Sequence, residues 1–542
     1  MTDFTAYSAT LHPIVKLEDD YNNILDHALE KGVSYIIRKN GSTYEAINGS
    51  TGKIDYSSAD AATVIQQSCN ALTAGRTTTE KIVIDGSFNL GSYGTQELTA
   101  YNSVVEEWDY GVLVPNYTEI EIQGKITSSA DIVSFLIADS HDIWIHGGTI
   151  KGSTSDDSGI KIAIINSYNC KVSNVNIIDS TIGSGAEGIL IDARSEDADI
   201  VSYCNTVENC YFSDIGDYAI YVGHARNNTI TKNTIQDTYK GITVTWDSSG
   251  NIISENHLDN QVLYPIFLQS QAYLNSVTNN VISNSQQDSI YLQYNIYNNL
   301  VSGNIISDSA GNGIKLVSDV IPPSVPAERG YVSDGNVYEN SIVNNQIYNS
   351  PTDGIVLLAH NSKSCLRNLV SGNTIHYAGW YYIREIQDTG GICDRNTYQN
   401  NRFNGFSTYK VLFLGANNIF DKTVTSAVLN LDGGLQQNNT YFATAKGFLV
   451  GYDVFYTEAT SADATAYSTI GMYNVGAAID TDYYDTIGSV VNATLGQRVS
   501  IPSTYLENLG INYGDIITVG TAGTKEGAGE LLLVLKIVEG VE

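Results

Sequence analysis

The chain has 542 residues and a formal net charge of −31, from 59 acidic and 28 basic side chains. Phosphate groups are bound by clustered Lys and Arg, so this charge argues against nucleic acid or an anionic membrane surface as a partner. The length exceeds what one compact core supports, which leaves several domains or a repetitive architecture. With 42% hydrophobic and 16% charged residues, the composition also excludes a disordered acidic chain.

The first 57 residues are expected to form a small α/β module. Apolar residues fall at helical spacing between residues 19 and 32, namely Tyr21, Ile24, Leu25, Ala28 and Leu29. Residues 34–47 then predict a β-hairpin around Asn40-Gly41, a pair that is typical of two-residue hairpin turns. We interpret this module as an attachment or capping piece.

Residues 58–420 are expected to form the main domain, which begins with a second helix. The segment 58–72 predicts a helix capped by Ser or Asp, and a strand at 81–90 follows it. The open end of a stack of strands exposes both its core and its strand edges. A helix at this position is therefore expected to cover that end.

A repeat of about 24 residues follows. Its anchors are spaced 24, 23, 24 and 24 residues apart, at Asn209, Asn233, Asn256, Asn280 and Asn304, and the pattern continues at Asn345, Asn373 and Asn401. A fixed period of this size indicates a solenoid. A leucine-rich repeat is the competing fold, but the units lack helical apolar spacing and instead hold three short alternating runs. Three strands per coil predict a parallel β-helix.

The stacking of such coils explains which residues recur. Coils lie roughly 4.8 Å apart, so like residues lie above like residues, and inward Ile, Val and Leu form one continuous core. Asn tolerates the left-handed backbone conformation and can pair its amide with that of the next coil. The recurrent asparagines are therefore predicted to form structural ladders at the turns. Two longer intervals predict loop insertions near residues 183–199 and 319–335.

On this repeat and the helix before it, residues 59–420 resemble the right-handed parallel β-helix, or pectate-lyase-like, superfamily. The opening helix and strand resemble those of viral tailspikes and tail fibres. The resemblance implies homotrimers, attachment to a virion tail or baseplate through the N-terminus, and a virion or extracellular location. The chain begins without a secretory signal and has no run of 18 apolar residues, which predicts a virion component without membrane insertion. No cofactor is expected.

Residues 421–542 lack the repeat. Long alternating strands, such as 425–431, 447–456 and 530–538, are joined by Gly and Asn turns and predict an antiparallel β-sandwich. The expected fold class is all-β: a right-handed parallel β-helix with three strands per coil, a small N-terminal α/β cap and a C-terminal antiparallel β-sandwich.

One face of the predicted β-helix is a candidate glycan surface. If Ile220 and its equivalents point inward, their neighbours form an outward column of aromatic rings flanked by amides. Sugar rings stack on aromatic faces, and amides bind hydroxyls. The alternatives are aromatic packing alone or burial against a sister chain. The predicted substrate-binding residues are Tyr221, Trp246, Phe267, Gln269, Tyr291, Gln293, Arg194 and His224.

Glycoside hydrolysis would need two carboxylates, about 5 Å apart for retention or roughly 6.5 to 9.5 Å apart for inversion. One coil step supplies the first distance and two steps supply the second. Asp192 and Asp247 both follow outward strands, and with Glu187 they are the predicted catalytic residues. Acidic residues at coil turns are ordinary in a chain of this charge, so a structural role is the alternative. Further candidates are Glu196, Asp197 and Asp217.

The six cysteines show no metal-binding spacing, and no metal site is predicted. Most are expected to be buried as small apolar residues, with a bridge between Cys204 and Cys210 as the alternative. The Asn-Thr-Asp, Gly-Asp-Asp and Gly-His-Gly motifs of polygalacturonase-like hydrolases are absent, which leaves catalysis open.

These features together predict a virion spike or fibre protein that binds a host surface glycan, with depolymerisation of that polysaccharide left open. A secreted polysaccharide lyase or glycoside hydrolase of cellular origin is one alternative. A structural or adhesive β-helix protein without catalysis is the other.

Overall fold

A computed structural model describes residues 32–99, 105–128, 131–152, 159–178, 185–194, 200–320, 335–404, 409–415 and 417–420, and separate strands between 427 and 539. The chain divides into two compact units. The first comprises Met1–Asn396 and Asn401–Gly415, and the second comprises Thr397–Asn400 and Ala416–Glu542. The predicted domain boundaries after residues 57 and 420 stay predictions.

The N-terminal strands extend a sheet of the main stack. β1 (Val33–Asn40) and β2 (Thr43–Asn48) form the predicted hairpin around Asn40-Gly41, and β3 (Ile54–Ser58) pairs with β2. β1 also pairs in parallel with β4 (Glu80–Asp85), the first strand of the stack in that sheet. The helix predicted between residues 19 and 32 lies almost wholly outside the described residues.

The predicted capping helix is present as α2 (Ala61–Asn70). It begins after Asp60, whose Oδ2 accepts a hydrogen bond from the Thr63 amide at 2.9 Å, as an N-cap does. The helix is shorter than the predicted range 58–72 because residues 54–58 belong to β3. Its apolar face, including Val64, Ile65 and Cys69, is buried.

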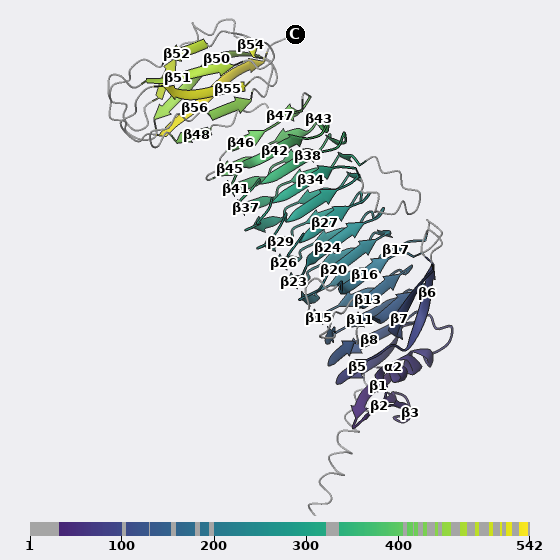
Figure 1. The fold of residues 1–542 in the computed structure, drawn as a ribbon. Helices are drawn as coiled ribbons and strands as arrows, with labels where there is room; N and C mark the ends of the chain where they lie inside the picture. The colour runs from purple at the N-terminus through teal and green to yellow at the C-terminus, as the bar shows by residue number, and fades with distance from the viewer. Residues whose placement is uncertain are drawn as a thin grey trace, which may run out of the picture. The chain divides into compact units, whose positions relative to one another are not determined.

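Three long sheets run through the stack, and most coils contribute one strand to each (Figure 1). The 13-stranded sheet holds β6 (Gly94–Thr99), β7 (Val105–Leu113), β10 (Val133–Ala138), β13 (Ile160–Ile165), β16 (Glu187–Asp192), β20 (Tyr218–Gly223), β24 (Lys240–Thr245), β27 (Ile266–Gln269), β30 (Ile290–Gln293), β34 (Ile314–Ser318), β38 (Ile355–Ala359), β42 (Tyr381–Gln387) and β46 (Tyr409–Leu412).

The 16-stranded sheet continues from β4 through β8 (Thr118–Ile122), β11 (Ile143–His146), β14 (Lys171–Ser173), β18 (Thr206–Glu208), β22 (Thr229–Thr231), β25 (Ile252–Ser254), β28 (Ser276–Thr278), β32 (Leu300–Ser302), β36 (Ser341–Val343), β40 (Leu369–Ser371), β44 (Thr397–Gln399) and β47 (Ile419–Phe420). The 12-stranded sheet holds β5 (Ser87–Leu90), β9 (Lys125–Ser128), β12 (Thr149–Lys151), β15 (Asn176–Ile178), β19 (Tyr211–Ser213), β23 (Thr234–Gln236), β26 (His257–Asp259), β29 (Val281–Ser283), β33 (Ile305–Ser307), β37 (Gln346–Ser350), β41 (Thr374–Ala378) and β45 (Arg402–Asn404).

Equivalent residues of successive coils pair in register, as the sequence period predicts. Ile220, Ile242, Ile266, Ile290 and Ile314 are consecutive partners across five parallel strands, and all are 0% exposed. This column forms part of the continuous apolar core. Such burial of apolar area is the main stabilising contribution to a stack whose coils contact only their neighbours.

The predicted asparagine ladder is present, with one change of register. The Oδ1 atom of Asn280 accepts hydrogen bonds from both the backbone N and Nδ2 of Asn256, each at 3.0 Å. The left-handed conformation predicted for the ladder residue belongs instead to the residue before it, such as Glu255. The ladder position in this coil is therefore Cys210 rather than the predicted anchor Asn209, because the backbone N of Cys210 donates to Asn233 Oδ1.

A second ladder, which the sequence analysis missed, runs beside the first through Asn228, Asn251, Asn275, Asn299, Asn340 and Asn368. Both ladders are buried, so the amides satisfy backbone groups at the corners of the coils that would otherwise be unpaired.

The second unit contains antiparallel strands in two sheets. One holds β48 (Ala427–Asn430), β56 (Glu530–Glu539), β50 (Gly447–Tyr456), β53 (Arg498–Ile501) and β54 (Gly510–Ile511). The other holds β49 (Asn439–Phe442), β55 (Ile516–Ala522), β51 (Tyr467–Tyr473) and β52 (Tyr483–Thr486). Their antiparallel pairing agrees with the prediction, and their packing as a sandwich stays a prediction. Among the described residues, no helix is long and apolar enough to cross a membrane.

Candidate functional site

The candidate site lies on the outward surface of the 13-stranded sheet, called here the outer face. Its middle row comprises Leu190, Tyr221, Thr243, Phe267, Tyr291 and Lys315. The row at the strand ends begins with Asp192 and continues through Gly223, Thr245, Gln269, Gln293 and Val317. The row at the strand starts includes Glu187, Tyr218 and Lys240. The alternation of inward and outward residues is therefore as predicted.

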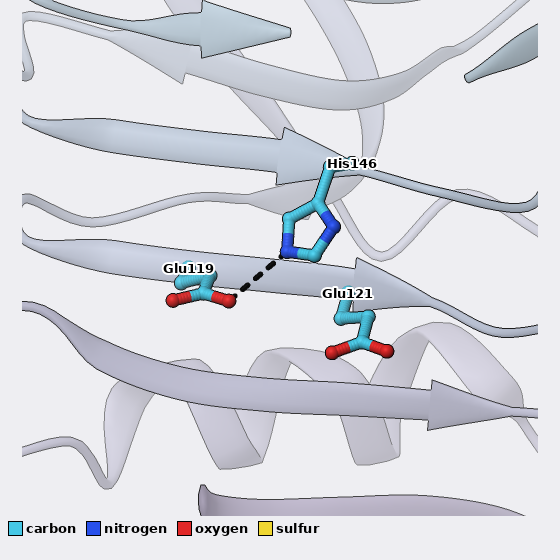
Figure 2. A group of neighbouring side chains, drawn as sticks. All are labelled: Glu119, Glu121 and His146. Atoms are coloured by element: carbon cyan, nitrogen blue, oxygen red, sulfur yellow. Dashed lines mark hydrogen bonds and ion pairs between the residues drawn. The ribbon is translucent and has the colours of Figure 1, made fainter. Parts of the chain in front are cut away.

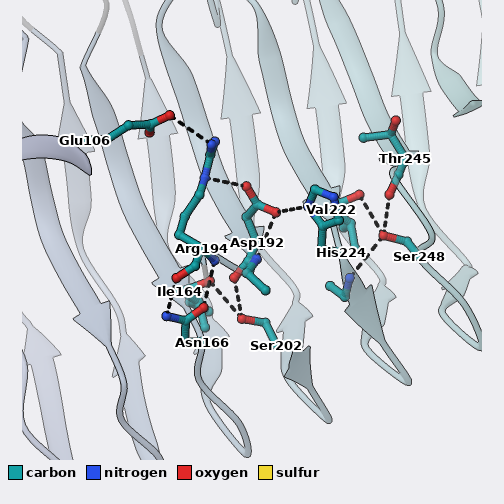
Figure 3. A network of polar contacts seen from close by, with 12 residues as sticks. Glu106, Ile164, Asn166, Asp192, Arg194, Ser202, Val222, His224, Thr245 and Ser248 are labelled. Carbon is teal, nitrogen blue, oxygen red and sulfur yellow. Dashed lines mark hydrogen bonds and ion pairs between the residues drawn. The ribbon is translucent and has the colours of Figure 1, made fainter. Parts of the chain in front are cut away.

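Asp192 is at the centre of a polar network (Figure 3). Its Oδ2 pairs with Arg194 Nε at 2.9 Å, and its Oδ1 lies 3.1 Å from His224 Nδ1 and accepts from the Ala193 amide at 2.8 Å. The side chain is 2% exposed. Burial alone would raise the pKa of Asp192, but Arg194 and His224 hold that pKa below its ordinary value.

The glycine at position 223 leaves room for the Asp192 network on the outer face. A Cβ at this position would meet the Tyr221 ring at 2.7 Å and Asp192 Oδ1 at 2.8 Å. The absence of a side chain lets Tyr221 lie close to the Asp192 carboxylate across successive coils. Three of the predicted site residues, Asp192, Arg194 and His224, are thus in direct contact, and Tyr221 borders them.

A hairpin of β6 and β7 closes the N-terminal end of this surface. Glu106 of β7 pairs with Arg194 Nη1 at 3.2 Å, and the Arg194 guanidinium lies 5.6 Å from the centroid of the Trp108 ring. Leu98 of β6 belongs to a buried apolar cluster with residues of the outer face, and Trp108 and Tyr110 pack against that cluster; its other buried members are Val133, Leu136, Ala163, Ile165 and Leu190.

Glu187 lies at the start of the strand that ends at Asp192. Burial raises its pKa to about 8, and the negative charges of Asp217 and Asp192 add to the effect. Its Oε2 is buried and has no hydrogen-bond partner in the described part of the chain. Glu187 is therefore a protonated acid at neutral pH.

Asp217, one coil further on, is bound by a cation. Lys240 Nζ lies 2.8 Å from Asp217 Oδ1 and 4.0 Å from the centroid of the Tyr218 ring. Asp217 was a further candidate from the sequence, whereas Tyr218 and Lys240 were not predicted. Their side chains come together only through the register at the strand starts, which the repeat of apolar pairs does not reveal.

The predicted aromatic column is present but largely buried. Phe267 and Tyr291 are each 7% exposed, and their rings stack on each other with centroids 5.1 Å apart and an interplanar angle of 8°. Tyr264 packs on both rings. Gln269 and Gln293 beside them are half-buried. The two rings cover each other's faces, so sugar stacking as predicted does not fit these two residues. The alternative of aromatic packing describes them better.

Asp247 does not join Asp192. Thr245 occupies the position two coils beyond Asp192, and Asp247 lies in the following turn, where its Oδ2 is 3.1 Å from Arg226 Nη2. The adjacent Trp246 is half-buried and lies nearly parallel to His224, at 6.2 Å between ring centroids. Asp192 and Asp247 therefore do not form the predicted pair of carboxylates. Glu196 and Asp197 lie outside the described residues.

A second cluster, Glu119, Glu121 and His146, lies on the 16-stranded sheet (Figure 2). One potential ligand atom from each residue lies within 4.8 Å of the others, a spacing that could hold a metal ion. The Lys81 ammonium, however, binds both carboxylates, at 2.6 Å from Glu119 and 2.5 Å from Glu121. Lys81 thus supplies the positive charge that a cation would provide.

Comparison with known proteins supports the architecture. The family described as "Right handed beta helix region" matches residues 89–246 and 161–321. The fold is a right-handed parallel β-helix. No curated protein sequence matches the chain.

Solved structures similar to this β-helix include the A-module of mannuronan C-5 epimerase AlgE6 from Azotobacter vinelandii, with 11% identity, a TM-score of 0.49 and coverage of 67% of this chain and 95% of that one. Another is the tailspike protein of E. coli bacteriophage HK620 in complex with pentasaccharide, with 14% identity, a TM-score of 0.47 and coverage of 88% of this chain and 89% of that one.

Proposed function

We propose that this β-helix binds a host surface polysaccharide on its outer face and hydrolyses it there. The observation behind this proposal is that three successive strands bring together three carboxyl groups and several partly exposed rings. The carboxyl groups are those of Glu187, Asp192 and Asp217, and the rings are those of Tyr218, Tyr221 and Trp246. Carboxyl groups with separate protonation states, beside aromatic surface, suit glycoside hydrolysis.

Within this proposal, Glu187 and Asp217 perform the chemistry. Glu187, protonated at neutral pH, donates a proton to the glycosidic oxygen as the bond breaks. Asp217 lies on the next coil, a step of roughly 5 Å, which is the separation of a retaining pair. Its carboxylate attacks the anomeric carbon as the glycosidic bond breaks, and a water molecule deprotonated by Glu187 then hydrolyses the bond between the sugar and Asp217. Lys240 positions Asp217 through its ion pair.

Asp192 has a positioning role in this scheme. Its two oxygens are occupied by Arg194, His224 and the Ala193 amide, so it is not free to attack a sugar. It fixes the two larger side chains beside the rings, where they can bind hydroxyl groups of the glycan. The predicted catalytic role of Asp192 is thereby replaced by one that its contacts support.

The test is incubation of the purified chain with the envelope polysaccharide of the host, followed by measurement of new reducing ends. We expect Glu187→Gln and Asp217→Asn each to lower turnover by about 100-fold or more while the variants still bind the polysaccharide. Asp247→Asn is the matched control, with turnover unchanged. Full cleavage by Glu187→Gln would refute the assignment.

A second candidate reaction is β-elimination, because one contact favours a base at His224. An ionised Asp192 can only accept hydrogen bonds, so His224 Nδ1 donates to it and Nε2 is the ring nitrogen that points away from the carboxylate. His224 Nε2 is buried and without a hydrogen-bond partner among the described residues. Elimination would produce an unsaturated sugar that absorbs ultraviolet light, and its loss in His224→Asn with cleavage retained in Glu187→Gln would favour this reaction.

We further propose that the chain acts as a virion spike or fibre, as a homotrimer attached through its N-terminal module. Labelling of purified particles with an antibody against residues 447–456 tests the location, and sedimentation of the intact chain tests the trimer. Absence of label from particles that contain the chain by mass spectrometry would contradict a surface location.

A further inference from the structure

We infer that Glu106 determines the charge preference of the proposed glycan site, because its carboxylate offsets the cation of Arg194 and disfavours acidic sugars there. This inference rests on the proposed function. It adds a specificity-determining residue, from the β6–β7 hairpin, that selects uncharged sugars over sugars that carry a carboxylate.

Arg194 lies between two carboxylates (Figure 3). Its Nη1 is 3.2 Å from Glu106 Oε1, and its Nε is 2.9 Å from Asp192 Oδ2. One guanidinium between two carboxylates leaves an excess of negative charge at this end of the outer face. Trp108 Nε1 donates to Glu106 Oε2 at 3.2 Å, so the second oxygen of that carboxylate is also held in place.

The two sides of the guanidinium differ in their exposure. The side chain of Asp192 is 3% exposed, whereas those of Arg194 and Glu106 are 26% and 35% exposed. The Asp192 side is therefore closed, and the Glu106 side is open to a ligand. A sugar that carries a carboxylate would approach Arg194 where Glu106 lies, so it would have to displace Glu106 or be repelled by it.

The alternation of β7 places Glu106 on the packed side of its hairpin. Glu106 and Trp108 are half-buried on that side, whereas Glu107 between them is exposed on the other side. Trp108 packs against the same buried cluster as Tyr221, a ring of the proposed site. The packing of the hairpin thus holds Glu106 beside the glycan site.

Stability of the fold gives little reason for a carboxylate at this position. A partly exposed ion pair contributes little to stability, because water screens it. Asp192 already provides Arg194 with a buried carboxylate. Apolar contacts of Leu98 and Trp108 attach the hairpin to the outer face. A role in selecting the ligand therefore accounts for Glu106 better than a role in folding.

A neutral sugar meets no such repulsion. Its hydroxyl groups can donate to Glu106 and accept from Arg194. Removing the charge of Glu106 should therefore raise the affinity for acidic sugars and leave the affinity for neutral sugars nearly unchanged. The Glu106→Gln substitution removes this charge while it keeps an oxygen that can accept from Trp108 Nε1.

The experiment compares two forms of one oligosaccharide, prepared from host envelope polysaccharide. In the neutral form all carboxyl groups are reduced to alcohols, and in the acidic form the primary hydroxyls are oxidised to carboxylates. Calorimetry with the full chain carrying Glu187→Gln measures the affinity for each form without cleavage. We expect this chain to prefer the neutral form, and adding Glu106→Gln should reduce the preference about tenfold through tighter binding of the acidic form.

Glu107→Gln is the matched control, because it removes the same charge from the next residue of β7, on the exposed side of the hairpin. It should leave the preference unchanged. Added salt should weaken the preference of the chain that retains Glu106 more than that of the Glu106→Gln chain, since salt screens the repulsion. A purely structural role of Glu106 would produce neither difference. Unaltered thermal unfolding of each variant shows that a change of affinity is not a loss of fold.

Two results would overturn the inference while the proposed function stands: the same preference in the Glu106→Gln and Glu107→Gln chains, or tighter binding of the acidic form by the chain that retains Glu106. An equal loss of affinity for both forms in Glu106→Gln would also contradict it, because the residue would then only support the site. If no chain binds either form, the proposed function fails and the inference fails with it.

Discussion

Asp192 Oδ1 and His224 Nδ1 are joined at 3.1 Å across two successive strands of the β-helix. Asp192 is 2% exposed and His224 is 7% exposed, so this contact is shielded from water. It couples the packing of adjacent coils to the orientation of the side chains that border the proposed glycan site.

Replacing Asp192 by Asn should therefore destabilise the fold. Arg194 and His224 would lose their carboxylate in a buried setting, and such a loss costs about 3 kcal/mol. Urea unfolding at pH 7 measures the difference. Asp247→Asn, which removes a partly exposed pair with Arg226, should cost less than about 1 kcal/mol.

The effect of Asp192 should depend on pH with a definite sign. Because its folded pKa is lowered, its contribution is complete above the unfolded pKa of about 3.9 and is lost as pH falls through the folded value. The stability difference between the parent chain and Asp192→Asn should thus shrink below pH 4. A constant difference from pH 7 to pH 2 would contradict the ion pairs described here.

Glu187 should show the opposite dependence. Its folded pKa of about 8 exceeds the unfolded value of about 4.3, so the stability it provides is complete below pH 4.3 and is lost as pH rises through 8. Glu187→Gln, which stays neutral, should lose less stability than the parent chain between pH 5 and pH 9. If Glu187 is the acid, turnover should also decline above pH 8 in the parent chain.

The asparagine ladder predicts a large cost for a single amide. Asn280→Ala removes the acceptor of the Asn256 backbone N and the donor to the Ile253 carbonyl, and it leaves Asn256 Nδ2 with the Ile230 carbonyl as its one acceptor. An unsatisfied buried group costs about 1 to 3 kcal/mol, so we expect a loss of about 3 kcal/mol in urea unfolding. Asn176→Ala, at an exposed position of β15, should cost under about 0.5 kcal/mol. Equal stability of the two variants would contradict the role of the ladder.

Thiol labelling should distinguish one cysteine. All six cysteines lie within the described residues as free thiols, and Cys204 alone is exposed. Burial raises the pKa of Cys69, Cys170 and Cys210 to about 12, which keeps these thiols protonated and unreactive. A maleimide should therefore modify one thiol per folded chain and none in Cys204→Ser. Modification of a second thiol before unfolding would show that the coils open.

Lys81 should decide whether the cluster on the 16-stranded sheet binds metal. Its ammonium lies between Glu119 and Glu121, so Zn²⁺ should not raise the melting temperature of the parent chain. Lys81→Met leaves two carboxylates and His146 within reach of one ion, and Zn²⁺ should then stabilise the variant. Adding His146→Ala should remove that stabilisation. Binding of Zn²⁺ by the parent chain would contradict this reading.

The architecture could be predicted because it repeats. A period near 24 residues and the alternation around Ile220 and its equivalents determine strands, register and core without any long-range information. The sequence pattern does not distinguish Asn209 from Asn233. In the structure, Asn209 has the left-handed backbone conformation and Cys210 occupies the ladder position, whereas Asn233 is itself a ladder residue.

Less of the candidate site than of the fold could be predicted from the sequence. Outward direction alone did not reveal that Phe267 and Tyr291 cover each other, since burial depends on neighbours in adjacent coils. The contact between Glu106 and Arg194 joins residues 88 positions apart through a hairpin that interrupts the period. Glu187 was a predicted catalytic residue, and that role stays a prediction; its raised pKa follows from packing that no spacing rule describes.

The ladder also bears on how such a protein can change over generations. Asn304 and Asn345 are 41 residues apart in sequence instead of 24. The distance from Asn304 Nδ2 to Asn345 Oδ1 is nevertheless 2.9 Å, close to the 3.0 Å from Asn280 Nδ2 to Asn304 Oδ1. New sequence inserted between two rungs leaves the scaffold intact. Surface segments can thus be exchanged while the ladder that supports them is inherited unaltered.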